Sequence, residues 1–178
     1  MRVLLALFFV VGVVTAPFAQ DAGDTEIRNG FRELRLGMTI EAAKAALGVD
    51  PNFAYRGDPD VSLLPSSGLP IIQTGGVAFI DRAILQFTDN QLYVLTLLLN
   101  RSRLDYFGLF SEFSSRYGDP DRLDPGQAVW ESEQVILSLE RPLTVKYVDV
   151  LLFAGVVEAG VLEESLENMT RERFLGQL

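Results

Sequence analysis

A short helix with both of its ends marked occurs twice in this sequence, and this recurrence constrains the fold more than any other feature. The first copy begins at Thr39, whose hydroxyl can accept a hydrogen bond from an otherwise unpaired backbone N–H of the first turn. It ends at Gly48, because glycine can adopt the left-handed conformation that closes a helix, and Pro51 prevents the helix from resuming. The same signals recur from Asp105 to Gly118. The sequence therefore predicts two helices, with positive φ at both glycines.

Each predicted helix has one apolar face that needs a covering layer. In the first helix, Ile40, Ala43 and Leu47 fall on one face. In the second helix the face is mainly aromatic and comprises Tyr106, Leu109, Phe110, Phe113 and Tyr117. This spacing is typical of helices that pack on a core. Phe107 lies off the stripe, and we expect it to face a partner or a cleft.

The clearest strand signal is a hairpin. Residues Ala83–Thr88 and Leu92–Asn100 are separated by Asp89-Asn90-Gln91, which tolerate the positive φ of a tight turn. The second strand is apolar on both faces, which is typical of a central strand covered on both sides or of a strand with one face in an interface. Alternation places Leu92, Val94 and Leu98 on one face of it. Further strands are predicted at Phe53–Tyr55, Ala128–Glu131, Gln134–Leu139 and Thr144–Phe153.

These elements predict an α+β fold in which helices pack on a mostly antiparallel sheet. The order of helix, glycine, Asp-Pro, short strand and hairpin occurs twice, which indicates two helix-plus-antiparallel-hairpin units over residues 37–100 and 105–153. The alternative is that glycine and Asp-Pro are common after any helix. A C-terminal helix is expected at about 158–169. Asp58–Gly76, rich in proline and glycine, is predicted to be a long irregular loop, a kind of segment that is often functional.

The start of the first unit resembles the SmpA/OmlA family. The residues that carry this resemblance are Gly37-Met38-Thr39, the helix up to Leu47-Gly48, and Pro51. Members of that family are small lipoproteins of the machinery that assembles outer-membrane β-barrels, so the resemblance implies two helices against a short antiparallel sheet. The present chain lacks the cysteine that would carry their lipid anchor. The duplicated layout is also similar to the β-lactamase inhibitor protein type, which is secreted and implies a protein partner.

The N-terminus has the layout of a secretory signal peptide. One basic residue precedes the apolar run Val3–Val14, and small residues follow, with cleavage expected after Ala16 or Ala19. An uncleaved anchor is the alternative, but a membrane-spanning helix needs roughly 20 apolar residues. We therefore expect residues 1–19 to be a signal peptide and 20–178 a single domain. A bacterial periplasm or the exterior fits best, and without cysteine the domain has no disulfides.

Composition excludes several classes of function. The chain is 48% hydrophobic and 22% charged, as expected of a folded globule. Its net charge of −9 and scattered basic residues argue against binding to nucleic acid or to anionic lipid, because both require neutralisation of phosphates by lysine and arginine. Because it has neither histidine nor cysteine, Ser-His and Cys-His catalysis and metal sites built from nitrogen or sulfur ligands are excluded. It also lacks a P-loop, a G-x-S-x-G elbow and a G-x-G-x-x-G turn.

Two groups of carboxylates remain as candidates for chemistry. The first lies near predicted strands and comprises Glu131, Glu133 and Glu140, which could serve as acid and base in a glycoside hydrolase. The second comprises Asp119, Asp121 and Asp124, a loop that could supply oxygen ligands to calcium. Leu123, however, stands where the EF-hand pattern requires an oxygen ligand. Surface and turn positions account for both groups, so we assign no catalytic residue, no cofactor and no metal.

The sequence is best interpreted as an exported, non-enzymatic protein that binds another protein or a component of the cell envelope. The sheet and the Asp58–Gly76 loop are the candidate surfaces. One alternative is a carboxylate-dependent hydrolase of envelope sugars, which needs two carboxyl groups facing each other across a cleft. Another is a carrier of a small apolar ligand, which needs a large apolar pocket between the helices and the sheet. The partner and the oligomeric state stay open.

Overall fold

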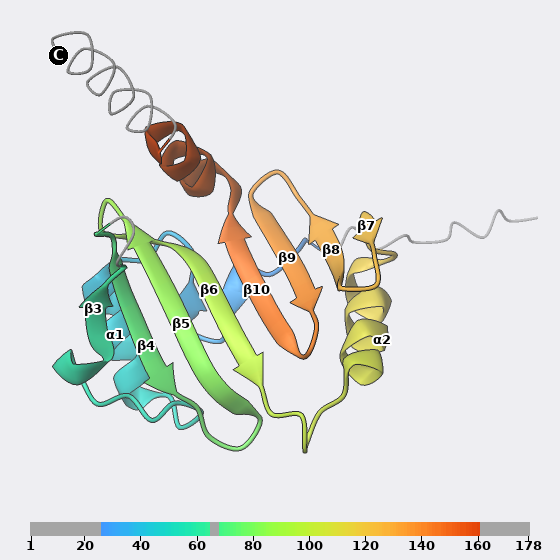
Figure 1. Cartoon of the computed structure of the whole chain (residues 1–178), viewed down its shortest axis with the longest axis horizontal. Helices are drawn as coiled ribbons and strands as arrows, with labels where there is room; N and C mark the ends of the chain where they lie inside the picture. The colour runs from blue at the N-terminus through green and yellow to red at the C-terminus, as the bar shows by residue number, and fades with distance from the viewer. Residues whose placement is uncertain (1–25, 65–67, 161–178) are drawn as a thin grey trace, which may run out of the picture.

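The computed structural model describes residues 26–64 and 68–160, which form an α+β fold, as the sequence predicts (Figure 1). The main sheet has eight antiparallel strands in the order β3-β4-β5-β6-β10-β9-β8-β7. Its strands are β3 (Val61–Leu63), β4 (Pro70–Gly75), β5 (Ile80–Thr88), β6 (Gln91–Leu99), β7 (Arg122–Leu123), β8 (Gln127–Glu131), β9 (Val135–Glu140) and β10 (Thr144–Asp149). The helices are α1 (Ile40–Val49) and α2 (Tyr106–Tyr117), and a two-stranded hairpin comprises β1 (Gly30–Phe31) and β2 (Leu34–Arg35).

The strand order is mirrored about the centre of the main sheet. Strands β3 to β6 follow α1 and strands β7 to β10 follow α2, and in each half consecutive strands pair as a meander. The two halves meet where β6 pairs with β10, with Leu97 opposite Val145. The two central strands, β6 and β10, therefore lie beside each other and carry the middle of the core.

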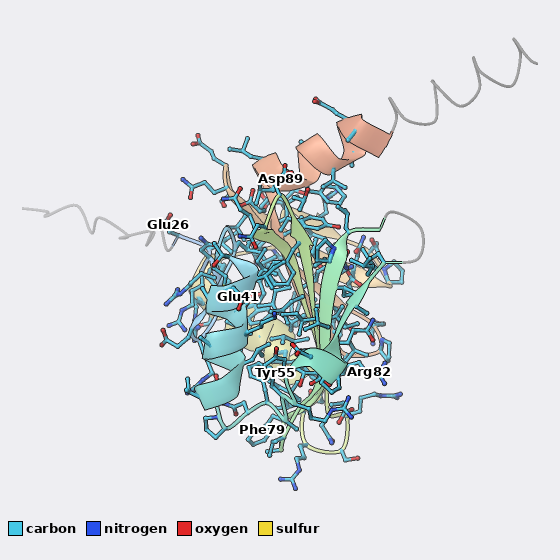
Figure 2. All side chains as sticks on the ribbon, turned by 90° about the vertical axis from the view of Figure 1, so that its left-hand side faces the viewer. Glu26, Glu41, Tyr55, Phe79, Arg82 and Asp89 are labelled. Atoms are coloured by element: carbon cyan, nitrogen blue, oxygen red, sulfur yellow. The ribbon has the colours of Figure 1, made fainter. Side chains whose placement is uncertain are left out.

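One face of the sheet carries the core. Ala43 and Leu47 of α1 and Leu34 of the β1–β2 hairpin belong to the same buried cluster as the inward-facing leucines of the central strands. The aromatic stripe of α2 packs against this cluster but is only half-buried. Figure 1 shows α1 and the hairpin behind the sheet, and Figure 2 shows α1 against that side edge-on. The contacts of the α2 stripe with the same cluster place α2 on this side too. Helices and hairpin together therefore cover a single face.

Local signals set the ends of both helices, with one exception. Thr39 Oγ1 accepts a hydrogen bond from Ala42 N at 3.3 Å, and Asp105 Oδ1 accepts one from Gly108 N at 2.8 Å. Gly118 ends α2 with φ of +83°, which confirms the prediction for that glycine. The prediction for Gly48 is wrong, because this residue lies inside α1, which continues to Val49. The helix ends at Asp50, whose extended backbone (φ −85°) needs no glycine.

The β5–β6 hairpin forms as predicted, but an irregularity in its strand pairing places Leu92 and Val94 on different faces of the sheet. Asp89 and Asn90 make the turn with φ of +47° and +62°. An irregularity in the pairing between Gln86 and Phe87 shifts the alternation at this end of the hairpin. As a result Leu92 is buried in the main core, whereas Val94 lies outside that cluster. The prediction that these two residues share a face is therefore wrong, since a bulge cannot be seen in a simple alternation.

The predicted loop Asp58–Gly76 is largely regular structure. It holds a 3-10 turn over Asp58–Asp60 and the edge strands β3 and β4, and only residues 65–67 lie outside the described part. Proline is tolerated at the start of an edge strand, as Pro70 is in β4, so its presence did not exclude a strand. Conversely, the predicted strand Phe53–Tyr55 is reduced to an isolated β-bridge between Phe53 and Gly76.

The last predicted strand is shorter than expected. Strand β10 ends at Asp149, and residues 150–160 are helical, so the predicted strand as far as Phe153 is wrong. Asp149 Oδ1 accepts hydrogen bonds from Leu151 N and Leu152 N, which caps the new helix. Of the C-terminal helix predicted at 158–169, residues beyond 160 lie outside the described part, as does the predicted signal peptide over 1–19. Within residues 26–64 and 68–160, no helix is long and apolar enough to cross a membrane.

Candidate functional site

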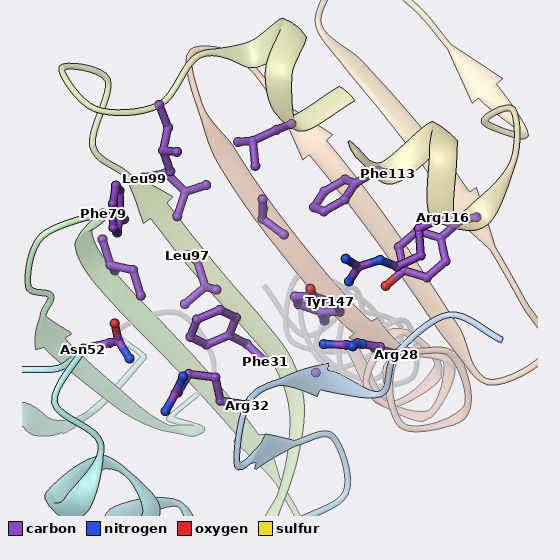
Figure 3. A pocket seen from close by; sticks show the side chains of 16 residues that line it. Arg28, Phe31, Arg32, Asn52, Phe79, Leu97, Leu99, Phe113, Arg116 and Tyr147 are labelled. Atoms are coloured by element: carbon purple, nitrogen blue, oxygen red, sulfur yellow. The ribbon is translucent and has the colours of Figure 1, made fainter. Parts of the chain in front are cut away.

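A cavity of about 330 Å³ lies on the helix-covered face of the sheet (Figure 3). It is bounded by the β1–β2 hairpin, by α2 and by the central strands. The residues that line it are Arg28, Gly30, Phe31, Arg32, Asn52, Phe79, Ile80, Leu97, Leu99, Leu104, Leu109, Phe113, Arg116, Tyr117, Val145 and Tyr147. Its size is within the range of small-molecule sites in proteins.

The floor of the cavity is an apolar strip of the two central strands. Leu97 and Leu99 come from β6, and Val145 and Tyr147 come from β10. Successive side chains of a strand point to opposite faces, so alternate residues of both strands share this face. Leu97 is directly opposite Val145 across the strand pair, and both are buried. The floor is therefore fixed by the sheet and does not depend on a loop.

Two aromatic side chains form the walls. Phe31 of the hairpin packs edge-on against Phe53, with ring centroids 6.2 Å apart. Phe113 of α2 packs edge-on against Trp130, with centroids 5.6 Å apart. Such edge-to-face pairs are favourable and hold each ring in place. The cavity thus has walls of fixed position, although neither Phe31 nor Phe113 is fully buried.

The charged residues of the lining are all arginines. Arg28, Arg32 and Arg116 contribute to it, and no Asp or Glu side chain does so among the described residues. Arg32 Nε donates to Asp50 Oδ2 at 2.8 Å, and Arg116 pairs at 2.5 Å with Glu112, one turn earlier in α2. Arg28 is exposed, and within the described residues no carboxylate pairs with it. An acidic chain therefore presents a locally basic opening here.

Tyr147 is the polar group of the cavity floor. Burial raises the pKa of its phenol to about 12; the neighbouring Tyr117 adds to this shift, whereas Arg28 and Arg116 oppose it. The phenol is therefore protonated at neutral pH and can act as a hydrogen-bond donor. Figure 3 shows Tyr147 between Arg28 and Arg116, at the opposite end of the cavity from Phe79 and Leu99.

The carboxylates considered from the sequence lie elsewhere. Glu140 is on the other face of the sheet, where it accepts hydrogen bonds from Lys146 Nζ at 2.6 Å and from Ser138 Oγ at 2.9 Å. Glu131 is paired with Arg122, and Glu133 is exposed in the turn before β9. The structure thus does not bring them together across the cavity.

In the acidic loop before β8, the carboxylates of Asp121 and Asp124 accept hydrogen bonds from backbone N–H groups. Asp121 Oδ2 accepts a hydrogen bond from Glu131 N at 2.7 Å, and Asp124 Oδ1 accepts one from Gly126 N at 2.7 Å. The Asp124 contact is that of an ordinary turn, whereas the Asp121 contact ties the loop to the end of β8. In the described part of the chain, no group of three or more acidic, histidine or cysteine residues is placed to hold a metal ion.

Two further sequence-level candidates do not contribute to the cavity. No described residue of the Asp58–Gly76 segment lines it. Phe107 is 75% exposed and borders a separate, shallow hollow beside Leu123. The residues that sequence reasoning missed are the arginines and Tyr147. Helical spacing could have placed Arg116 beside Phe113, three residues earlier, and strand alternation could have placed Tyr147 beside Val145.

Comparison with known proteins gives a family. The family model described as the TP0088 domain matches residues 29–159, a segment that contains every residue of the cavity lining except Arg28. No curated protein and no solved structure matches the chain.

Proposed function

The chain belongs to the TP0088 domain family, and we propose that it is an exported, non-enzymatic binding protein that holds a small, mainly apolar component of the cell envelope. The observation that carries this proposal is the cavity on the sheet, with its floor of leucine and valine and its aromatic walls. Pockets of this size that are lined mainly by apolar side chains, with a small number of polar groups, are typical of ligand sites.

The lining favours binding over hydrolysis. A glycoside hydrolase needs two carboxyl groups on either side of the bond that it cleaves. The described lining offers arginine, asparagine and tyrosine as its polar groups instead. Arginine stays protonated at physiological pH and is a poor general base, so these groups are suited to hold a ligand.

Export and duplication are part of the same proposal. The signal-peptide layout of residues 1–19 supports export. The mirrored strand order, with one helix preceding each four-strand meander, supports an origin in two copies of a helix-plus-sheet unit. In this interpretation the cavity lies where the two units meet, at the β6–β10 pair.

A cavity-filling variant tests the proposal. The native protein should bind the neutral fluorescent probe N-phenyl-1-naphthylamine saturably, at one site per chain. Val145→Phe should abolish this binding, because the larger side chain would occupy the cavity floor. Val148→Phe is the matched control, since Val148 is on the same strand but points to the opposite face.

Unfolding curves of both variants are measured in parallel to confirm that each is folded. The proposal is rejected if the native protein does not bind the probe, or if folded Val145→Phe binds it as well as the native protein does.

A further inference from the structure

The distribution of charge around the cavity indicates the chemical class of the ligand. We infer that the cavity binds a single-chain amphiphile with an anionic head, its tail lying along Leu97 and Leu99 and its head between Arg28 and Arg116. This inference rests on the proposed function, because it assumes that the cavity is a ligand site. It adds the sign of the head group, the number of tails and the residues that recognise each part.

The two ends of the cavity differ in chemistry. Figure 3 shows Arg28 and Arg116 on either side of Tyr147 at one end, with Phe79 and Leu99 at the other. The polar side chains toward the Phe79 end, Asn52 and Arg32, both donate hydrogen bonds to Asp50, at 2.7 Å and 2.8 Å. A tail lying along Leu97 and Leu99 would therefore contact mainly apolar atoms, whereas a head at the Tyr147 end would meet donors. The orientation of the ligand therefore follows from the lining.

The donors at the basic end fit an anion. A guanidinium group presents a fork of N–H donors that matches a carboxylate or a phosphate, and such charge-assisted hydrogen bonds are stronger than neutral ones. Arg28 has no carboxylate partner among the residues that the structure describes. Arg116 keeps donors beyond the one paired with Glu112. The phenol of Tyr147 can donate one more hydrogen bond.

The charge of the cavity lining argues against a cationic head group on the ligand. The chain carries a net charge of −9, and yet the described cavity lining contains three arginines and no acidic residue. A cationic head would be attracted to most of the protein surface but repelled by this lining. Asp50 and Glu112 pair with Arg32 and Arg116 from outside the lining, which leaves Arg28 as the arginine of the lining without a carboxylate partner among the described residues. This local positive charge favours an anionic head group.

The volume limits the ligand to one tail. A water molecule occupies about 30 Å³ in the liquid, and a methylene group is of similar size. A cavity of about 330 Å³ thus accommodates on the order of ten carbon atoms. This matches one medium-length chain, whereas two chains of a diacyl lipid would not fit.

Displacement of the neutral probe by three ten-carbon ligands tests the inference. Decanoate and decyl phosphate carry the two possible anionic heads, and decanol carries none. We expect at least one anion to bind about tenfold tighter than decanol, because hydrogen bonds to charged groups contribute this much even at a partly exposed site. The stronger of the two anions identifies the head group. Inorganic phosphate should not displace the probe, since it has no tail.

A pair of double variants identifies the recognising residues. Arg28→Gln/Arg116→Gln should weaken the preferred anion about tenfold while leaving decanol and the neutral probe unchanged. The control, Arg82→Gln/Arg101→Gln, removes the same charge from exposed positions outside the cavity lining and should preserve the preference. Figure 2 shows Arg82 on the side of the sheet away from α1.

The outcomes separate this inference from the proposed function. If decanol binds as tightly as both anions, or if the two double variants behave alike, the anionic head is wrong and the apolar site still stands. If neither the probe nor any amphiphile binds, both the proposed function and this inference are overturned. Retained binding of decanol by Arg28→Gln/Arg116→Gln shows that this variant is folded.

Discussion

Alanine substitutions at Gly48 and Gly118 should change stability in opposite directions. Gly48 lies within the last turn of α1, and a methyl group added there would meet no atom within 4 Å. Alanine is favoured over glycine in a helix, because glycine loses more backbone freedom on folding. We therefore expect Gly48→Ala to raise the free energy of unfolding by about 0.5–1 kcal/mol.

Gly118 should respond in the opposite sense. Its φ of +83° and ψ of −167° belong to a backbone region that is essentially restricted to glycine. An added methyl group would again meet open space, so the cost is backbone strain alone, about 1–3 kcal/mol. Relaxing that strain would move the Gly118 carbonyl, which accepts a hydrogen bond from Trp130 Nε1 at 2.9 Å.

Unfolding followed by tryptophan fluorescence measures both effects, since Trp130 is the single tryptophan and is buried. For a domain of this size, 1 kcal/mol corresponds to about 4 °C in melting temperature. Gly48→Ala should melt a few degrees higher with unchanged emission, and Gly118→Ala should melt lower with red-shifted emission. The substitution is chemically identical at both sites, so each variant controls the other. Equal destabilisation by both would show that our account of where α1 ends is wrong.

Three further measurements test other parts of the structure. Phe113→Ala should lower the free energy of unfolding by about 2 kcal/mol in urea, less than for a fully buried ring, because Phe113 is half-buried against Trp130. Burial opposes ionisation of Asp60, but hydrogen bonds from Arg56 outweigh it and hold the pKa of that carboxyl below its usual value. This stability is present above about pH 4 and should be lost as the pH falls further, and Asp60→Asn should flatten that dependence. Mass spectrometry of the native protein should find an N-terminus near Pro17 or Gln20, and an intact chain in a membrane pellet would contradict export.

The elements predicted correctly are those whose signals are local. The cap residues Thr39 and Asp105 and the turn residues Asp89 and Asn90 act within three or four positions of themselves, so the sequence alone identifies them. The wrong predictions concern segments whose secondary structure depends on contacts with residues far away in the sequence. The helix that follows Asp149, for example, replaces a segment whose apolar residues fit a strand equally well, and short apolar runs do not distinguish the two.

The candidate site was beyond sequence analysis because its parts are far apart in the chain. Arg28 and Phe31 come from the start of the domain, Arg116 from α2 and Tyr147 from the last strand of the sheet. Only the sheet order, with β6 beside β10, brings these segments together. Carboxylates are the catalytic groups that the sequence suggests, but the charged side chains that line the cavity are arginines. These arginines are far apart in the sequence, so they do not form a recognisable pattern there.

The geometry of the layers explains why a cavity forms at the centre of this fold. Eight strands about 4.8 Å apart make a sheet about 34 Å wide. Two helices with their side chains, each about 10 Å across, cover only about 20 Å of that width. The middle of the sheet is left to the short β1–β2 hairpin, which is too small to fill the space beside α2. The same shortage explains why no residue of α2 is fully buried despite its aromatic stripe. A ligand with an apolar tail would supply the missing layer, so binding should protect α2 and β10 together in hydrogen exchange.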